Sequence, residues 1–394
     1  MASAGQEAEP PSSERKKDRD SIQALLTEGA HPMLGNGTHV NGLLDGATAQ
    51  VPAIAPELEV ARKVAGDLYR PMEERLEAFE DIFDSEIGDT GLNRARNIER
   101  EVGLRQIFLK FDGGNPTGTQ KDRIAFAQAQ DALRRGFDGM TIATCGNYGA
   151  AVCLAAGVAG LRCVVFIPEG YHTKRIEEMV RNGAELVRVP GDYENAVTVS
   201  RHHAEVEEMY DANPGGANTA LQLRAYGEIA NEIYDELRDA PAAVAVPVSN
   251  GTTLAGIYRG FVSLYRRGKT SRVPRMVAGS SFGKNPIIQA YLKGTSECGD
   301  LPPEAIHETE VNEPLINWHS ADGQFALEAI RSSSGWAGYA TDKGMTTFAR
   351  LIREHEGLSV LPASTAGLIA ILDRHRKEPL ANDRYVVILT GRRT

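Results

Sequence analysis

Residues 114–123 read Gly-Asn-Pro-Thr-Gly-Thr-Gln-Lys-Asp-Arg, a run of turn-forming residues that leads into a helical pattern. Thr117 or Thr119 can cap this helix, which we expect to begin near Lys121. The positive end of a helix dipole disfavours a charged lysine, and this field together with desolvation lowers the pKa of the amine. A neutral amine is what a Schiff base requires. From the residues alone, Lys121 is either such a reactive amine or a surface lysine that tolerates a helix start.

Short apolar runs alternate with helical patterns along much of the chain. The apolar runs predict strands over residues 139–143, 162–167, 185–189, 242–248 and 384–389. Helices are predicted over residues 148–158, 172–182, 194–207 and 254–265. Strand–helix units at this spacing predict an α/β fold of mainly parallel sheets covered by helices on both faces. Ligands bind at the carboxyl ends of the strands in such sheets.

One strand-to-helix turn lies at residues 143–149, and it contains Thr144, Cys145, Gly146, Asn147 and Tyr148. Small residues let successive backbone N–H groups point into one concavity at a helix N-terminus, which can hold a substrate carboxylate. The Asn147 amide can also donate a hydrogen bond to a phenolate-like oxygen of a cofactor. The alternative is an ordinary turn with the asparagine in a left-handed conformation.

A second such turn contains Ser249, Asn250, Gly251, Thr252 and Thr253. Its hydroxyls and the backbone N–H groups around the glycine can bind a phosphate at the start of the next helix. The turn matches neither the P-loop of nucleotide hydrolases nor the dinucleotide-binding glycine pattern. The alternative is an N-capped helix that follows a tight turn.

The last predicted strand ends at Thr390, just before Gly391. A hydroxyl at the end of a buried strand can contact an aromatic ring nitrogen as a neutral partner. An aspartate there would keep that nitrogen protonated, whereas a threonine need not. Strands that end in Thr-Gly are common, so this signal is weak by itself.

Composition narrows the class of protein. The chain has 394 residues, 43 basic and 53 acidic, and a formal net charge of −10 with no long basic stripe, so we expect no nucleic-acid partner. It also lacks a long apolar run and a signal-peptide pattern, so we expect no membrane span and a cytoplasmic location. The four cysteines form no C-x-x-C pair, so we expect buried free thiols. The adjacent histidines 202 and 203 do not share a helix face, so we expect no metal site.

The segments described above together resemble the pyridoxal-phosphate (PLP) enzymes of the tryptophan-synthase-β fold type, and most closely the threonine synthase family. The matches are Asn115 to Arg123, Gly146–Asn147, Ser249 to Thr253, Thr390 and the glycine-bounded segment 356–367. The resemblance implies that Lys121 carries PLP as a Schiff base and that Asn147 contacts the cofactor O3′. It further implies that residues 249–253 bind the cofactor phosphate, that Thr390 meets the pyridine nitrogen, and that residues 144–148 bind the substrate carboxylate.

The resemblance also implies a reaction and an organisation. The reaction is elimination and replacement on an amino acid with a phosphate leaving group, from O-phosphohomoserine to threonine. We expect a tail over residues 1–50, a large PLP-binding lobe over 51–125 plus 220–394, and a small mobile lobe over 126–219. A homodimer is expected from the resemblance alone.

Two departures leave the substrate open. Thr119–Gln120 stands where threonine synthases usually have Ser-Phe, and the phosphate loop contains a single glycine, Gly251. Replacement on phosphoserine by sulfite, as in cysteate synthase, and simple dehydration of serine or threonine therefore stay as alternatives. An alternative of another class is a non-catalytic protein that binds a metabolite.

Overall fold

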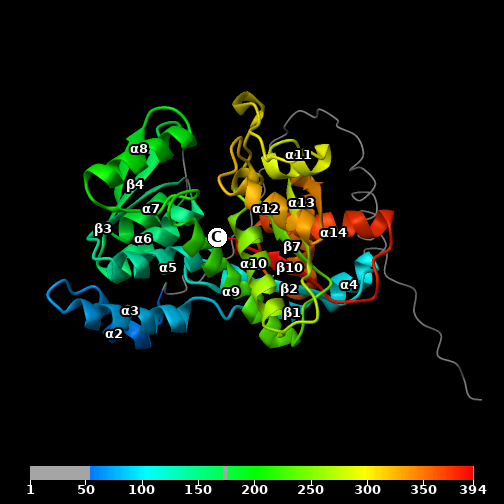
Figure 1. Ribbon diagram of the computed structural model, residues 1–394, viewed down its shortest axis with the longest axis horizontal. Helices are drawn as coiled ribbons and strands as arrows, with labels where there is room; N and C mark the ends of the chain where they lie inside the picture. Colours follow the sequence, from blue (N-terminus) through cyan, green and yellow to red (C-terminus); the bar gives the residue numbers. More distant parts are fainter. Residues whose placement is uncertain (1–53, 145, 172–174, 394) are drawn as a thin grey trace, which may run out of the picture.

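The computed structural model describes residues 54–144, 146–171 and 175–393. The expected tail, Cys145 and the first residues of the helix expected over 172–182 lie outside the described residues. Ten strands form two sheets within the described part of the chain, and Figure 1 shows them side by side with helices packed around each. An α/β fold of mainly parallel sheets is therefore confirmed.

The larger sheet has six strands in the order β1-β2-β10-β7-β8-β9. The antiparallel β1–β2 pair lies at one edge, and every other neighbouring pair is parallel. The strands are β1 (Leu92–Arg94), β2 (Ile107–Phe111), β7 (Ala243–Pro247), β8 (Arg275–Ser281), β9 (Trp336–Ala340) and β10 (Tyr385–Leu389).

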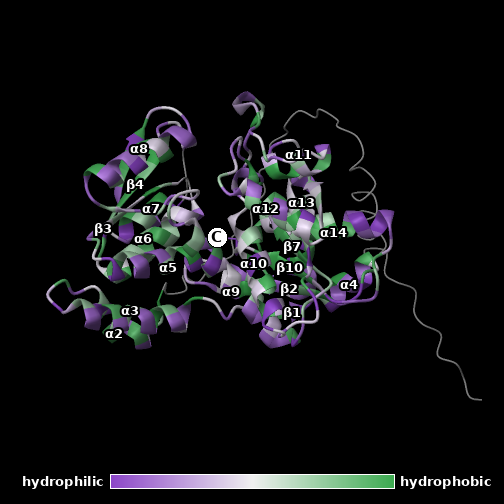
Figure 2. Cartoon of the chain, viewed as in Figure 1, coloured by the Kyte–Doolittle hydropathy of each residue, from purple (hydrophilic) through white to green (hydrophobic). Residues whose placement is uncertain are grey.

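Helices cover both faces of this sheet because successive side chains of a buried strand point to opposite faces. Val244 and Val246 of β7 belong to a core shared with α10 and α12, whereas Ala243 and Ala245 belong to a core shared with α13 and α14. In Figure 2 the strands β7 and β10 are mainly hydrophobic, whereas the outer helix α3 carries many hydrophilic residues. The helices around this sheet are α4 (Arg96–Val102), α9 (Thr219–Leu237), α10 (Thr252–Arg266), α11 (Pro286–Lys293), α12 (Gly323–Ser332), α13 (Asp342–Glu356) and α14 (Ala366–Lys377).

The smaller sheet has four parallel strands in the order β5-β4-β3-β6. These are β3 (Gly139–Ala143), β4 (Arg162–Pro168), β5 (Glu185–Val189) and β6 (Tyr210–Asp211). Helix α8 packs on one face, and α5 and α6 pack on the other, where α2 and α3 join them. The helices are α2 (Glu59–Ala65), α3 (Met72–Glu86), α5 (Lys121–Arg134), α6 (Asn147–Ala159), α7 (Ile176–Arg181) and α8 (Tyr193–Val206).

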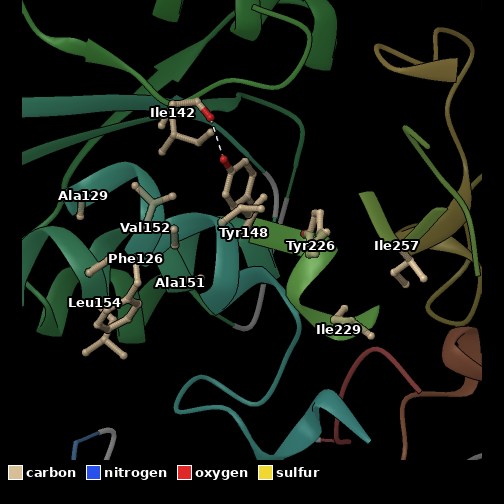
Figure 3. Packing of buried hydrophobic residues seen from close by; sticks show 14 of the residues in the cluster. Phe126, Ala129, Ile142, Tyr148, Ala151, Val152, Leu154, Tyr226, Ile229 and Ile257 are labelled. Carbon is tan, nitrogen blue, oxygen red and sulfur yellow. Dashed lines mark hydrogen bonds between the residues drawn. The ribbon is translucent and has the colours of Figure 1, made fainter. Parts of the chain in front are cut away.

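A continuous apolar core joins the two halves through α5, α6, α9 and α10. Figure 3 shows Phe126, Tyr148 and Tyr226 within this core, together with Ile257 of α10. Short 3-10 helices occupy the connections η1 (Pro56–Leu58), η2 (Asp112–Gly114), η3 (Pro303–Ala305), η4 (Glu313–Leu315) and η5 (Pro362–Thr365). The shared core packs α5, α6 and α10 against one another across the two halves.

The described cysteines and the helices bear on two further expectations. Cys153 and Cys163 are buried free thiols as predicted, whereas Cys298 is only partly buried. Over the ranges that the structure describes, no helix combines the length and the apolar character that a membrane crossing needs.

Candidate active site

The N-termini of α5, α6 and α10 meet at one cavity of about 70 Å³. Its lining combines the starts of these three helices with the carboxyl ends of β7 and β10, from residues Lys121, Asn147, Ser249, Thr253 and Thr390 among others. A second cavity of about 450 Å³ adjoins it, because Lys121, Asn147, Ser249 and Asn250 line both. The structure thus brings together residues that lie up to 270 positions apart in the sequence, from Gln120 to Thr390.

Lys121 is the first residue of α5, as the sequence predicted. Its Nζ lies 5.1 Å from the centre of the Tyr148 ring. Burial lowers the pKa of the Lys121 amine from 10.5 to about 8, although the Asp322 carboxylate opposes this shift. A substantial fraction of the amine is therefore neutral in slightly alkaline solution, as covalent chemistry at a lysine requires.

The predicted cap of α5 is partly wrong. Gln120 occupies the N-cap position and makes no side-chain cap, while Thr119 Oγ1 accepts a 3.3 Å hydrogen bond from the Lys121 N–H. Thr117 is engaged elsewhere, because its N–H and hydroxyl donate to the two oxygens of Asp122 at 2.9 and 2.7 Å. Asp122 therefore closes the turn before the helix, and its burial raises the pKa of this carboxyl to about 7.

A buried ion-pair network holds α5 against its neighbours. The Arg123 guanidinium donates to both carboxyl oxygens of Asp112 at 2.9 Å and to Glu232 of α9. Lys110 of β2 also pairs with Glu232. Despite the opposing effect of burial, hydrogen bonds and charge from Arg123 lower the pKa of Glu232 to about 2. Removing one partner would leave a buried charge unpaired, so this network fixes the helix that carries Lys121.

The end of the chain clamps the loop before Lys121. The Thr390 carbonyl accepts a hydrogen bond from the Gln120 N–H at 2.9 Å. The Arg392 guanidinium donates to the carbonyls of Gly113 and Pro116 at 3.2 and 3.0 Å. Arg392 was not predicted as a site residue, and the structure shows that it braces this loop. The Thr390 hydroxyl lies 3.1 Å from the hydroxyl of Ser364 and also lines the small cavity.

The loop before α6 contributes Thr144, Gly146, Asn147 and Tyr148 to the larger cavity, and Cys145 lies outside the described residues. Thr144 Oγ1 accepts hydrogen bonds from the N–H groups of Gly146 and Gly149 at 3.3 and 3.2 Å. The Tyr148 side chain lies among core residues in Figure 3. Its hydroxyl donates to the Ala212 carbonyl at 2.7 Å. The ring of Tyr148 therefore lines the cavity, while its hydroxyl is turned away.

The loop after β7 ends in a left-handed glycine, Gly251, with φ of +93°. Helix α10 begins at Thr252, two residues before the predicted start, and its first backbone N–H groups have no acceptor within the helix. The Thr252 hydroxyl donates to Asp322 at 2.5 Å, so its hydrogen is already engaged. All five residues of this turn, from Ser249 to Thr253, line the small cavity.

Three polar side chains hold this loop in place, and none of them was among the predicted site residues. Asn285 Nδ2 donates to the Ser249 carbonyl at 3.0 Å, and Ser320 Oγ donates to the same carbonyl at 3.1 Å. Asn317 Nδ2 donates to Asn250 Oδ1 at 3.0 Å. Asn317 and Ser320 come from segments that show no periodicity or motif. Asn285 caps α11 and precedes Pro286, a pair that indicates a helix start and not a ligand site.

The donor set of the small cavity suits a phosphorylated aromatic aldehyde. A helix N-terminus with free N–H groups can hold a phosphate, and a partly neutral lysine amine can bind the aldehyde. The Thr390 hydroxyl, which lies 3.1 Å from the buried Ser364 hydroxyl, can meet a ring nitrogen without protonating it. The helix start, Lys121 and Thr390 line one cavity, and their chemistry fits PLP.

Two parallel sheets with a lysine at the helix start between them define a PLP-dependent enzyme of the tryptophan-synthase-β fold type. The model of the family described as "Pyridoxal-phosphate dependent enzyme" matches residues 83–391. The chain belongs to this family, which confirms the predicted cofactor and enzyme class.

Threonine synthases are among the known proteins whose sequences are similar to this chain. The threonine synthase of Methanocaldococcus jannaschii is 30% identical over 77% of this chain and 74% of its own length. That of Synechocystis is also 30% identical, over 77% of this chain and 76% of its own length.

Solved structures share the fold at lower sequence identity. Maize serine racemase superimposes with a TM-score of 0.66 at 17% identity, covering 81% of this chain and 94% of its own. Threonine deaminase from Solanum lycopersicum gives 0.67 at 16% identity, covering 91% and 95%.

Proposed function

We propose that this chain catalyses PLP-dependent elimination and replacement on the side chain of an α-amino acid, as a lyase of the threonine synthase type. The observation that carries the proposal is the position of Lys121, whose amine lies at the junction of the two cavities. The threonine synthase relatives favour phosphate as the leaving group, O-phosphohomoserine as the substrate and threonine as the product.

Each group around Lys121 receives a role in this proposal. Lys121 binds the cofactor aldehyde, and the turn Ser249, Asn250, Gly251, Thr252 and Thr253 holds its phosphate. Thr390 meets the ring nitrogen, and Asn147 donates its amide hydrogen to the ring oxygen. Thr144, Cys145, Gly146, Asn147 and Tyr148 form the loop that binds the substrate carboxylate. The supporting observation is that the described members of both sets line two adjoining cavities.

The chemistry divides between the cofactor and the protein. When bound, PLP supplies an electron sink that stabilises negative charge on the substrate α-carbon. The Lys121 amine takes the α-proton, since its lowered pKa lets it accept and return a proton near neutral pH. The loop before α6 orients the carboxylate so that the α-proton faces this amine, and it limits the access of water.

Borohydride reduction of the purified protein with PLP, followed by peptide mapping, tests the assignment of Lys121. A pyridoxyl group on the Lys121 peptide is expected, with loss of both the label and the cofactor absorbance in Lys121→Ala. Lys110→Ala is not a usable control because Lys110 lies in the buried network, so the exposed Lys269→Ala serves instead. A label on another lysine, or no label, would remove the proposal.

The alternatives are separated by products. Incubation with O-phosphohomoserine, phosphoserine with and without sulfite, serine and threonine distinguishes the candidate reactions by released phosphate, cysteate, ammonia or threonine. Turnover of phosphoserine alone would move the assignment to a cysteate-synthase-like reaction. Bound PLP without turnover of any amino acid would favour the metabolite-binding protein.

The lobes, the assembly and the location are further parts of the proposal. A small mobile lobe over 126–219 is supported by the separate four-stranded sheet, and the packing of α2 and α3 on α5 and α6 favours adding residues 59–86 to it. The rest of residues 51–125 together with 220–394 then forms the large lobe. A homodimer is testable by light scattering, and a cytoplasmic location by cell fractionation.

A further inference from the structure

Glu313 places a carboxyl group in the larger cavity, across from the loop before α6. Its Oε1 accepts a 2.7 Å hydrogen bond from the Tyr171 hydroxyl, which follows β4 on the other side of the cavity. A Cβ built at Gly146 would lie 4.0 Å from the same oxygen. The carboxyl therefore faces the loop that we assign to the substrate, in a cavity that also contains Lys121.

The backbone that carries Glu313 is fixed. The Thr309 N–H donates to Asn312 Oδ1 at 2.8 Å, and the Asn312 N–H donates back to Thr309 Oγ1 at 3.1 Å. The Glu313 N–H donates to the Thr309 carbonyl at 3.1 Å. Asn312 is 1% exposed, so this turn is anchored in the protein and fixes the backbone from which the Glu313 side chain extends.

The surroundings of Glu313 favour its protonated form. Burial raises the pKa of this carboxyl above its ordinary value, the Tyr171 hydrogen bond lowers it, and the charge of Glu308 raises it. Among the described residues of this cavity, Lys121 is the one basic side chain. The other titratable groups that line it are Tyr148, Tyr171, Asp192, Tyr193, Glu194 and Glu308.

We propose that Glu313 is a second catalytic acid–base residue, which exchanges protons with the leaving group and with the incoming nucleophile. The inference rests on the proposed function, in which Lys121 handles the α-proton. A reaction that expels one group and adds another needs a proton for the first and a base for the second. Glu313 supplies both from one position opposite the substrate loop.

The elimination step and the addition step each account for every atom, electron pair and proton. In elimination, the bond between a substrate side-chain carbon and the leaving oxygen breaks, the electron pair departs with the oxygen, and Glu313 gives that oxygen a proton. In addition, the oxygen of water bonds to the unsaturated carbon while its proton passes to the Glu313 carboxylate. Glu313 thus ends in the protonation state in which it began.

This role restricts the nucleophile to a neutral molecule that carries its own proton, such as water or an amine. Sulfite (SO₃²⁻) has no proton to pass to the Glu313 carboxylate, so addition of sulfite would leave Glu313 without the proton that it gave up in the elimination step. The inference therefore separates a threonine-synthase-like hydration from a cysteate-synthase-like replacement.

Glu313→Gln in the holoenzyme tests the proposal, because glutamine keeps the shape and the Tyr171 contact but cannot exchange this proton. The rate at which the substrate α-proton exchanges with deuterium should stay within about twofold of the wild type. The rate of product formation should fall about 10²- to 10³-fold, and its pH profile should lose the ionisation step that belongs to Glu313. Glu304→Gln, exposed on the same segment and outside the cavity, is the matched control. Tyr171→Phe should shift that ionisation step along the pH axis and reduce product formation less than Glu313→Gln does.

An infrared pH-difference spectrum without substrate gives an independent readout, in which a carboxyl band should vanish in Glu313→Gln. The proposal is overturned if Glu313→Gln makes product within about threefold of the wild type, or loses α-proton exchange as strongly as product formation. Preference of the wild type for sulfite over water would overturn the restriction on the nucleophile. A wild type without any α-proton exchange would instead refute the proposed function, and this inference with it.

Discussion

The guanidinium of Arg175 donates a 2.6 Å hydrogen bond to the side-chain oxygen of Asn147. This contact leaves the amide N–H₂ of Asn147 as the group that can donate into the cavity. The same guanidinium donates to the Thr117 carbonyl at 2.8 Å and pairs with Glu178 at 2.7 Å. Arg175 therefore ties the loop before Lys121 to the loop before α6, and it sets the orientation of the asparagine between them.

Arg175→Lys should weaken cofactor binding about tenfold, because a lysine cannot donate to all three partners at once. Charge-assisted hydrogen bonds contribute about 1.5–3 kcal/mol each, of which about 1.4 kcal/mol corresponds to a factor of ten in affinity. A spectral titration with PLP measures the change, and the absorbance maximum should also move as the Asn147 amide loses its orientation. Arg181→Lys on the exposed face of α7 is the control, and equal effects in both variants would contradict this role.

The pH dependence of cofactor loading should follow the Lys121 amine. Burial lowers the pKa of this group to about 8, so its neutral fraction is small at pH 6 and rises as the pH increases through about 8. The rate at which the cofactor-free protein takes up PLP should rise over the same interval. Stopped-flow absorbance across this range measures the midpoint, and a rate that is flat or falls with pH would refute the assignment.

Asp322→Asn should move that midpoint to lower pH, because the Asp322 carboxylate is the charge that raises the pKa of Lys121 against the effect of burial. The asparagine oxygen can still accept the hydrogen bond from Thr252, so the loop is expected to persist. A displacement of up to about one pH unit is expected. Glu328→Gln, on the exposed face of the same helix, should leave the midpoint unchanged.

The sequence predicted the strands β3, β4, β5, β7 and β10 from their apolar residues, but it did not predict β1, β2, β6, β8 and β9. Of the missed strands, β8 and β9 have sequences that are rich in alanine, glycine and serine. The reason lies in their packing, since a Cβ at Gly279 of β8 would lie 2.1 Å from the carbonyl oxygen of Ala366. Helix α14 approaches the sheet so closely that small residues are required, and small residues carry little strand signal.

In the same way, the sequence predicted some residues of the site and missed others. Lys121, Asn147 and Gly251 lie in turns whose residue types already suggested a ligand site. Asn317 and Arg175 act through side chains that reach these turns from segments without a motif, so only the folded chain reveals them. The sequence thus indicates where chemistry occurs, while the supporting contacts depend on tertiary structure.

Thr390→Val should reduce turnover about tenfold and weaken PLP binding, because it removes the hydroxyl proposed to meet the ring nitrogen. The variant also leaves the Ser364 hydroxyl without the 3.1 Å partner that it now has, at a cost of about 1 kcal/mol in stability. Thr390→Ser retains the hydroxyl and should stay near the wild type. Steady-state rates and urea unfolding separate the two effects, and a Val variant as active as the Ser variant would exclude the contact.

Gly251→Ala should both lower the free energy of unfolding and weaken the binding of the cofactor phosphate. Residue 251 has φ of +93°, and an added Cβ would lie 2.8 Å from the Ala326 Cβ and 3.0 Å from the Asp322 carbonyl. Left-handed strain costs about 1–2 kcal/mol, and displacement of packed neighbours adds about 1–3 kcal/mol.

The matched control variant is Gly268→Ala. Residue 268 has φ of +67°, and nothing lies within 4 Å of the new Cβ, so this variant has the backbone strain without the displaced neighbours. Urea unfolding should show a larger loss for Gly251→Ala, and a PLP titration should show weaker binding for that variant only; equal behaviour of the two would mean that the tight turn at 251 does not shape the phosphate site.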